Sequence, residues 1–181
     1  MTTLSRYALS GERKNVTEGH DEIASYLKSR GIRFEAWETS ELEVDASPEA
    51  ILTAYEGSVN TLKAESGFQS ADVIRLHPAH EMREELRSKF LDEHTHSDDE
   101  IRFFVEGKGL FYMHFDDEVI SVMCERGDLI GVPANTKHWF DMGPEPSFTC
   151  IRLFTTPEGW VADFTGDKIA DAFPRFEEHS A

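Results

Sequence analysis

The sequence predicts a mainly β protein with flanking helices (α+β), in which short strands form a sandwich or barrel. Helical spacing of apolar residues is confined to the first half of the chain and disappears after Phe90. From there, short apolar runs alternate with turns rich in Gly, Asp and Pro, which is the pattern of antiparallel strands. The regular spacing of these runs favours two packed sheets or a closed one.

The first half carries recognisable helix ends. Gly31 follows an apolar stripe and is a natural C-terminal stop, and Ser47 followed by Pro48 matches an N-cap and the first helical position. We therefore expect helices over residues 21–30, 48–55, 58–68 and 78–90. One short strand is expected near the N-terminus, before the chain becomes polar, and two more over residues 32–37 and 71–76. The helix over 78–90 has its apolar stripe at Ala79, Met82, Leu86 and Phe90.

The second half reads as a succession of strands. Gly107-Lys108-Gly109 is predicted to be a tight turn between the first two of them. Strands are expected over residues 101–106, 110–115, 119–124, 129–132, 136–140, 148–155 and 160–164, before a short helix over 168–173. Without a repeat or linker, we expect a single domain over residues 1–181, with a helical flank (about 20–90) packed on a β-barrel (about 90–165).

Composition excludes several classes of partner. The chain has 18 Lys and Arg against 35 Asp and Glu, a net charge of −17, which argues against nucleic acid and anionic membranes. Two cysteines without a Cys-x-x-Cys motif do not imply a disulfide scaffold. The N-terminus lacks the apolar core of a signal peptide, and no apolar run approaches the ~20 residues of a membrane span. The expected location is cytoplasmic.

One stretch suggests a metal site. His94 and His96 are spaced so that a strand would turn both imidazoles to one face. Glu100 shares their parity, although the residues between favour a turn. A later Gly-x5-Pro-x4-His segment ends at His138 and offers a third imidazole from another strand. Such a combination is far more specific than a lone His, which is usually a solvated or satisfied polar residue.

This ligand set leaves two coordination geometries open. Four nitrogen and oxygen ligands would fill a tetrahedral structural zinc site. An octahedral Fe(II), Ni(II) or Mn(II) ion would keep two coordination positions open, where a substrate could chelate the metal or bind beside dioxygen.

Two arginines stand out in apolar strands. Arg102 shares the parity of Glu100 and is interpreted as a fixed cation for an anionic substrate, the alternative being a solvated strand face. Arg152 repeats the pattern. Phe90, Phe140 and Trp160 are candidates for pocket walls, although each alone is compatible with ordinary core packing.

Three further residues are candidates beside the ligands. Glu93 and Asp99 could accept hydrogen bonds from the ligand imidazoles, or be surface carboxylates. His114 lies on an expected strand but is interpreted as a non-ligand, because the two motifs are complete without it.

The two segments resemble the paired motifs of the cupin superfamily. The matching residues are His94, His96, Glu100, Gly107, Gly127, Pro133 and His138, and the departures are Ser88, Asn135 and Met142. None of the departures is a ligand, and Asn tolerates the positive φ that the Gly usual at position 135 would adopt. The resemblance implies a cupin β-barrel, a jelly-roll-like double-stranded β-helix of two facing sheets with the metal inside.

Within that superfamily, the whole chain looks like the acireductone dioxygenases of methionine salvage. The similarity includes residues 93–103, Lys137–Met142, Ile151–Phe154 and Gly159-Trp160. It implies one Fe(II) or Ni(II) per chain on His94, His96, Glu100 and His138. It also implies a substrate-activating role for Arg102 and a substrate-side role for Arg152. A monomer is expected by resemblance.

The resemblance further implies O2-dependent cleavage of the acireductone 1,2-dihydroxy-3-keto-5-methylthiopentene. The Fe(II) form would give 4-methylthio-2-oxobutanoate and formate, and the Ni(II) form 3-(methylthio)propanoate, formate and CO. Two alternatives remain. Another cupin dioxygenase or isomerase would share the ligands but not need Arg102 and Arg152, and a non-catalytic cupin would bind a metal or small molecule without consuming O2.

Overall fold

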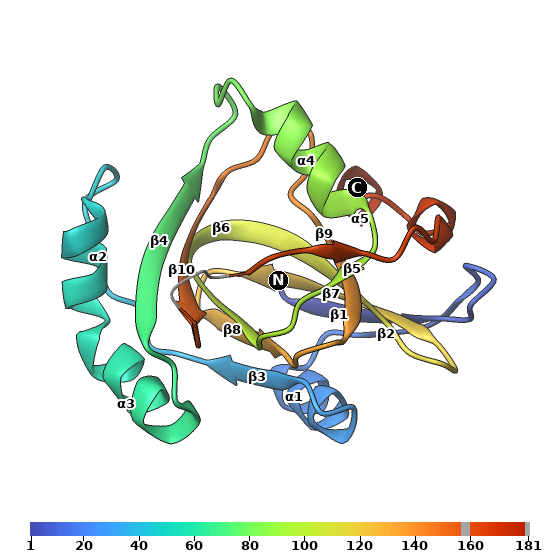
Figure 1. Cartoon of the computed structure of the whole chain (residues 1–181), viewed down its shortest axis with the longest axis horizontal. Helices are drawn as coiled ribbons and strands as arrows, with labels where there is room; N and C mark the ends of the chain where they lie inside the picture. Colours follow the sequence, from blue (N-terminus) through green and yellow to red (C-terminus); the bar gives the residue numbers. More distant parts are fainter. Residues whose placement is uncertain (157–159, 180–181) are drawn as a thin grey trace.

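The computed structural model describes residues 1–156 and 160–179. Its strands form two facing antiparallel sheets that share one long strand, β6 (Glu100–His114) (Figure 1). The first sheet has the order β11 (Asp163–Phe164), β5 (His94–Thr95), β9 (Lys137–Asp141), β6, β7 (Val119–Glu125), β1 (Thr3–Tyr7) and β2 (Arg13–Thr17). The second has the order β4 (Ser70–Leu76), β10 (Phe148–Phe154), β6, β8 (Asp128–Val132) and β3 (Arg33–Ala36). The predicted mainly β class with two packed sheets is confirmed.

The shared strand β6 bends at its middle. Its first half pairs with β10 and β8, and its second half pairs with β7 and β9. Gly107 permits the bend, because its φ of 74° lies in the left-handed region and a Cβ would meet the Ser147 carbonyl oxygen at 1.9 Å. The tight turn predicted over Gly107-Lys108-Gly109 is therefore wrong, since the chain bends there without reversing.

We predict that Gly107→Ala destabilises the fold far more than Gly31→Ala. Both glycines have a left-handed φ, 74° and 77°, but a Cβ at Gly31 would meet nothing within 4 Å. Gly31→Ala should therefore cost only the backbone penalty of about 1 kcal/mol. Gly107→Ala adds a main-chain clash and should cost about 3 kcal/mol or more. Equal midpoints for the two variants in urea unfolding would contradict this account of the bend.

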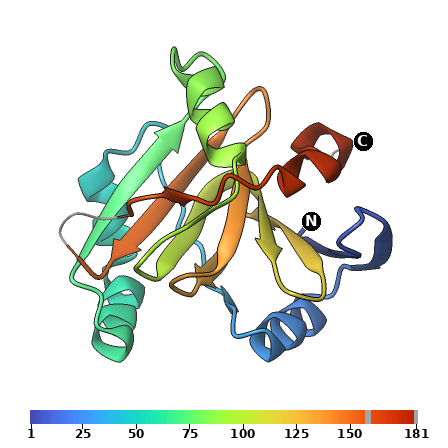
Figure 2. The same ribbon diagram turned by 45° about the vertical axis from the view of Figure 1, so that its right-hand side comes forward.

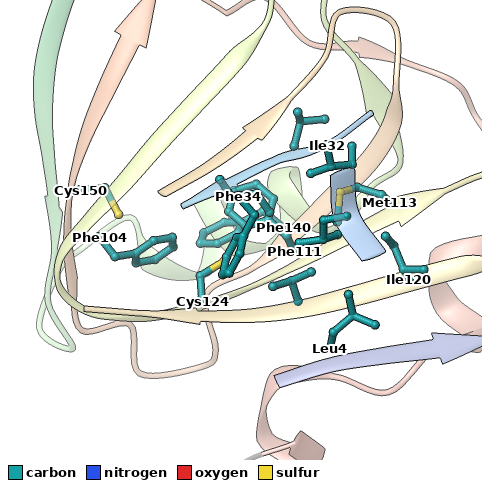
Figure 3. Packing of buried hydrophobic residues seen from close by; sticks show 14 of the residues in the cluster. Leu4, Ile32, Phe34, Phe104, Phe111, Met113, Ile120, Cys124, Phe140 and Cys150 are labelled. Atoms are coloured by element: carbon teal, nitrogen blue, oxygen red, sulfur yellow. The ribbon is translucent and has the colours of Figure 1, made fainter. Parts of the chain in front are cut away.

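Apolar side chains fill the space between the sheets. Phe104, Phe111 and Phe140 come from β6 and β9 and meet in the barrel interior (Figure 3). Cys124 and Cys150 lie in the same cluster, and both thiols are free. Burial raises the pKa of Cys150 to about 12 and that of Cys124 well above its usual value, so both thiols stay protonated and inert.

Helices cover the outside of the barrel (Figures 1 and 2). Their bounds are α1 (His20–Ser29), α2 (Pro48–Ala54), α3 (Glu56–Ser66), α4 (Arg83–Leu91), the 3-10 turn η1 (Ile169–Ala172) and α5 (Phe176–His179). On the outer face of β6, Phe103 and Val105 cluster with Ile51 of α2, with Val59 and Leu62 of α3, and with Tyr55 between the two helices. Among the described residues, none of these helices has the length and apolar content needed to span a bilayer.

Several elements differ from the predicted bounds, and α4, β11 and η1 are three examples. The helix expected to begin at Pro78 begins at Arg83, because the preceding residues form turns in which the His80 Nδ1 accepts the Met82 N–H at 3.2 Å. Met82 is 49% exposed and leaves the apolar stripe, whereas Leu86 and Phe90 pack against the core. The last strand is only Asp163–Phe164, and the expected terminal helix is the short turn η1.

Candidate metal centre

The four residues predicted as metal ligands converge inside the barrel. His94 lies on β5, His96 follows it, Glu100 begins β6 and His138 lies on β9 directly opposite His94. All four are buried, with at most 7% of each residue exposed. The nitrogens of the three imidazoles that could bind a metal lie within 4.8 Å of one another. The Glu100 Oε2 lies 3.0 Å from the His96 Nε2 and 3.1 Å from the His138 Nε2.

Glu100 reaches the site by a different route from the one the sequence suggested. The expectation was that strand parity turns Glu100 to the same face as the two histidines. In the structure, β5 ends at Thr95 and a bend at Ser97 and Asp98 separates it from β6. Glu100 therefore converges on the imidazoles from a separate strand.

Main-chain carbonyls fix all three imidazoles. The Nδ1–H groups of His94, His96 and His138 donate to the carbonyl oxygens of Asp92 at 2.7 Å, Val161 at 3.0 Å and Thr136 at 2.8 Å. A proton held on Nδ1 leaves the Nε2 lone pair free to bind a metal. Each ring is thus oriented and held in the metal-binding tautomer by the backbone.

Glu93 and Asp99, interpreted from the sequence either as acceptors for the ligand imidazoles or as surface carboxylates, accept hydrogen bonds from other groups. The buried Glu93 carboxylate accepts hydrogen bonds from the His114 Nδ1–H at 2.6 Å and from the Thr165 hydroxyl at 2.7 Å. Asp99 accepts the backbone N–H of Ala134 at 2.8 Å. His114 is thereby turned to Glu93 and stands apart from the three grouped imidazoles.

The charges in the site favour cation binding. Burial alone would raise the pKa of the Glu100 carboxyl, but Arg102 and the hydrogen bonds with His138 and His96 hold that pKa well below its usual range. Burial and the neighbouring His138 ring lower the pKa of His94 to about 4. Although burial opposes it, the hydrogen bond with Glu100 raises the pKa of His96. The ionised Glu100 carboxylate suits a divalent metal, which would displace the proton shared between this carboxylate and the Nε2 of His96 or His138.

The spacing of the donors also fits a metal ion. Two ligands about 2.1 Å from a metal and at right angles to each other lie about 3.0 Å apart. The distances from the Glu100 Oε2 to the His96 and His138 nitrogens, 3.0 and 3.1 Å, match this value. The residues present therefore fit a divalent ion with imidazole and carboxylate ligands.

Arg102 lies beside this group with part of its guanidinium unused. Only 5% of the residue is exposed, and its Nη2 donates to the Glu100 Oε1 at 3.0 Å. Its Nε and Nη1 are buried and have no hydrogen-bond partner among the described residues. The rings of Phe140, Trp160 and Phe111 lie 4.7, 5.5 and 5.4 Å from its Cζ. Buried donors without acceptors are costly, so they suit an anionic ligand that enters the site.

Arg152 has a different arrangement. Its Nε and Nη2 donate to the two carboxylate oxygens of Asp72 at 2.9 and 2.6 Å, and the Phe154 and Trp160 rings lie 5.2 and 5.4 Å from its Cζ. Asp72 faces Arg152 across the β4–β10 pair. Arg152 lines the site cavity, but a carboxylate already occupies two of its nitrogens.

A cavity of about 100 Å³ opens onto the four candidate ligands. Phe90, Phe140 and Trp160, the three candidates for pocket walls, all line it. Other lining residues were not foreseen from the sequence; these are Lys89, Ala162 and Phe164. Phe164 is a wall because β11 places its ring 5.7 Å from that of His94. No sequence motif predicted that this short, exposed strand would contribute to the site.

Comparison with known proteins agrees with the geometry. Residues 6–162 match the model of the ARD/ARD' family. A protein of Hahella chejuensis named acireductone dioxygenase is 61% identical over 162 residues, which cover 90% of this chain and 88% of that protein. One of Marinobacter nauticus with the same name is 53% identical over 179 residues, covering 98% and 97%.

A solved structure shares the fold. It is described as acireductone dioxygenase from Bacillus anthracis with cadmium ion in active center, and it aligns with a TM-score of 0.80 and 29% identity. The alignment covers 91% of this chain and 98% of that one. Gly159, part of the resemblance seen in the sequence, lies outside the described residues, whereas Trp160 lies in the cavity wall. From the family match and these relatives, the chain belongs to the ARD/ARD' family, the acireductone dioxygenases.

Proposed function

We propose that the chain cleaves the acireductone 1,2-dihydroxy-3-keto-5-methylthiopentene with O2, at one Fe(II) or Ni(II) ion held by His94, His96, Glu100 and His138. The observation that supports the proposal is that two features lie in one cavity. The four donors fit a divalent metal, and Arg102 points unpaired, buried donors into the same space.

Bound there, the metal would supply Lewis-acid chemistry and open positions for the two oxygens of a chelating enediolate. The protein's task is to bind the substrate as an anion and to exclude water. The acireductone is an acidic enediol, and the fixed charge of Arg102 favours its deprotonated form. The Nε and Nη1 of Arg102 would donate to the substrate oxygens, which gives these buried groups the acceptors they lack.

The apolar part of the substrate suits the cavity walls. Phe90, Phe140, Trp160 and Phe164 present aromatic surface around the candidate ligands, and a methylthioethyl tail packs well against aromatic rings. Removal of water from the enclosed site would strengthen the contacts between Arg102 and the anion. We assign Arg152 the role of bordering the substrate, with its orientation set by Asp72.

The side chains do not encode one metal. Imidazole and carboxylate ligands without a thiolate suit iron, nickel, cobalt and manganese. We therefore predict that the same apoprotein accepts both Fe(II) and Ni(II). The expected products are 4-methylthio-2-oxobutanoate and formate with Fe(II), and 3-(methylthio)propanoate, formate and CO with Ni(II).

Reconstitution of apoprotein with each metal tests this prediction. O2 uptake with an acireductone substrate is measured alongside CO in the headspace, and metal content is determined by elemental analysis. Metal-free protein is the control and should consume no O2 above the uncatalysed rate. Headspace CO from the iron form, or one product mixture from both forms, would contradict the predicted division. No O2 uptake by either loaded form would contradict the proposed function.

A further inference from the structure

Lys89 lines the site cavity from the last turn of α4. The residue is exposed to solvent. In the part of the chain that the structure describes, its ammonium has neither a hydrogen bond nor an ion pair. It is thus a free positive charge at the edge of the cavity that leads to the candidate ligands.

The other charged residues that line the cavity are already paired. Arg102 contacts Glu100, and Arg152 contacts Asp72. Lys89 therefore adds a positive charge that is in no ion pair with a carboxylate of the described residues. The charge of Lys89 is opposite in sign to that of the molecule as a whole, whose net charge of −17 repels anions.

The position of Lys89 is fixed by the docking of its helix. Arg87 donates from Nε and Nη2 to the two carboxylate oxygens of Asp141, on β9, at 2.8 and 3.1 Å. One residue after Lys89, Phe90 places its ring 6.4 Å from that of Phe140. These two contacts hold the last turn of α4 over the strand that carries His138, so Lys89 stays at the cavity.

We propose that Lys89 is an electrostatic capture residue that draws the anionic enediolate into the cavity. The inference rests on the proposed function, because an acireductone substrate enters as an anion. Lys89 offsets the repulsion of the acidic surface at the point of entry. It acts on capture and binding and leaves the chemical step to the groups deeper in the site. Its removal should therefore lower kcat/KM and leave kcat unchanged.

Charge-changing variants test this role. The assay uses metal-loaded protein and a desthio acireductone, a substrate analogue whose tail lacks the sulfur atom. At low salt, Lys89→Gln should lower kcat/KM about 3-fold and Lys89→Glu about 10-fold. Lys89→Arg should retain the parent value. The differences should shrink as salt rises from 0.01 to 0.15 M, because the screening length falls from about 30 to about 8 Å. Without O2, the dissociation constant of the same acireductone, measured by calorimetry, should rise in the same order.

Lys28→Glu is the matched control. Lys28 is also an exposed lysine in the last turn of a helix, but α1 lies at the opposite end of the molecule from α4 (Figure 1). This variant makes the same change in net charge and should behave like the parent. If Lys89→Glu matched the parent in kcat/KM and affinity, or if Lys28→Glu lost as much, the capture role would be wrong while the proposed function stood. If the loaded parent neither bound nor oxidised the acireductone, both would be wrong.

Discussion

Replacing His96 with alanine is expected to abolish metal retention and turnover together. His96 supplies one of four donors, and its Nε2 lies 3.0 Å from the Glu100 Oε2. Loss of a residue that merely orients a ligand already lowers metal affinity about 10- to 100-fold, so loss of the ligand itself should exceed that range. Elemental analysis after dialysis against a chelator, with O2 uptake on the same sample, gives the measurement.

His114→Gln is the informative control for this experiment. His114 is a partly buried histidine near the site, but its ring is hydrogen-bonded to Glu93. A glutamine can keep a hydrogen bond to that carboxylate, so this variant should retain metal and activity. Near-stoichiometric metal in His96→Ala, or loss of metal from His114→Gln alone, would overturn the assignment of ligands.

Replacing Arg102 with alanine is expected to leave the metal bound and to lower turnover by about 10²-fold. Two buried guanidinium nitrogens lack a partner among the described residues and are available to the substrate. Loss of one charged contact to a reacting anion costs a few kcal/mol, which corresponds to about that factor in rate. The absorbance change that accompanies deprotonation of the acireductone, followed without O2, should move to higher pH in the variant.

Arg30→Ala controls for the loss of an ion-paired arginine that lies away from the site. Arg30 pairs with Asp117 and Glu118 on the turn before β7, and none of these residues lines the cavity. This variant should lose stability and keep the parent rate for each folded molecule. The role given to Arg102 fails if Arg102→Ala deprotonates and turns over the acireductone as the parent does.

The residues that form the site were largely predictable from the sequence because their types are chemically unusual. His94, His96 and His138 belong to two motifs with specific spacing, and the structure brings their imidazoles together. An arginine in an apolar strand, such as Arg102, also signals a function, since a buried charge is costly. These features depend on the type of residue and on short spacings along the chain.

What the sequence did not predict depends on the path of the backbone. The hairpin of β1 and β2 was seen only as one short strand, because most of β2 is exposed and all of its residues except Val16 are polar. Gly107 was interpreted as part of a turn, although it bends a continuous strand between two sheets. The bend at Gly107 is decided by contacts that join segments distant in sequence, where local patterns carry little information.

The three carbonyl acceptors behind the imidazoles have a consequence for mutagenesis. Alanine scanning would overlook them, since a substitution at Asp92, Thr136 or Val161 changes the side chain and leaves the carbonyl in place. Val161 is 70% exposed, so its side chain can vary widely while its backbone still holds the His96 ring. A one-residue insertion or deletion in the same loops would instead rotate a ring away from its partner. Engineering of this metal environment must therefore alter loop length and backbone geometry.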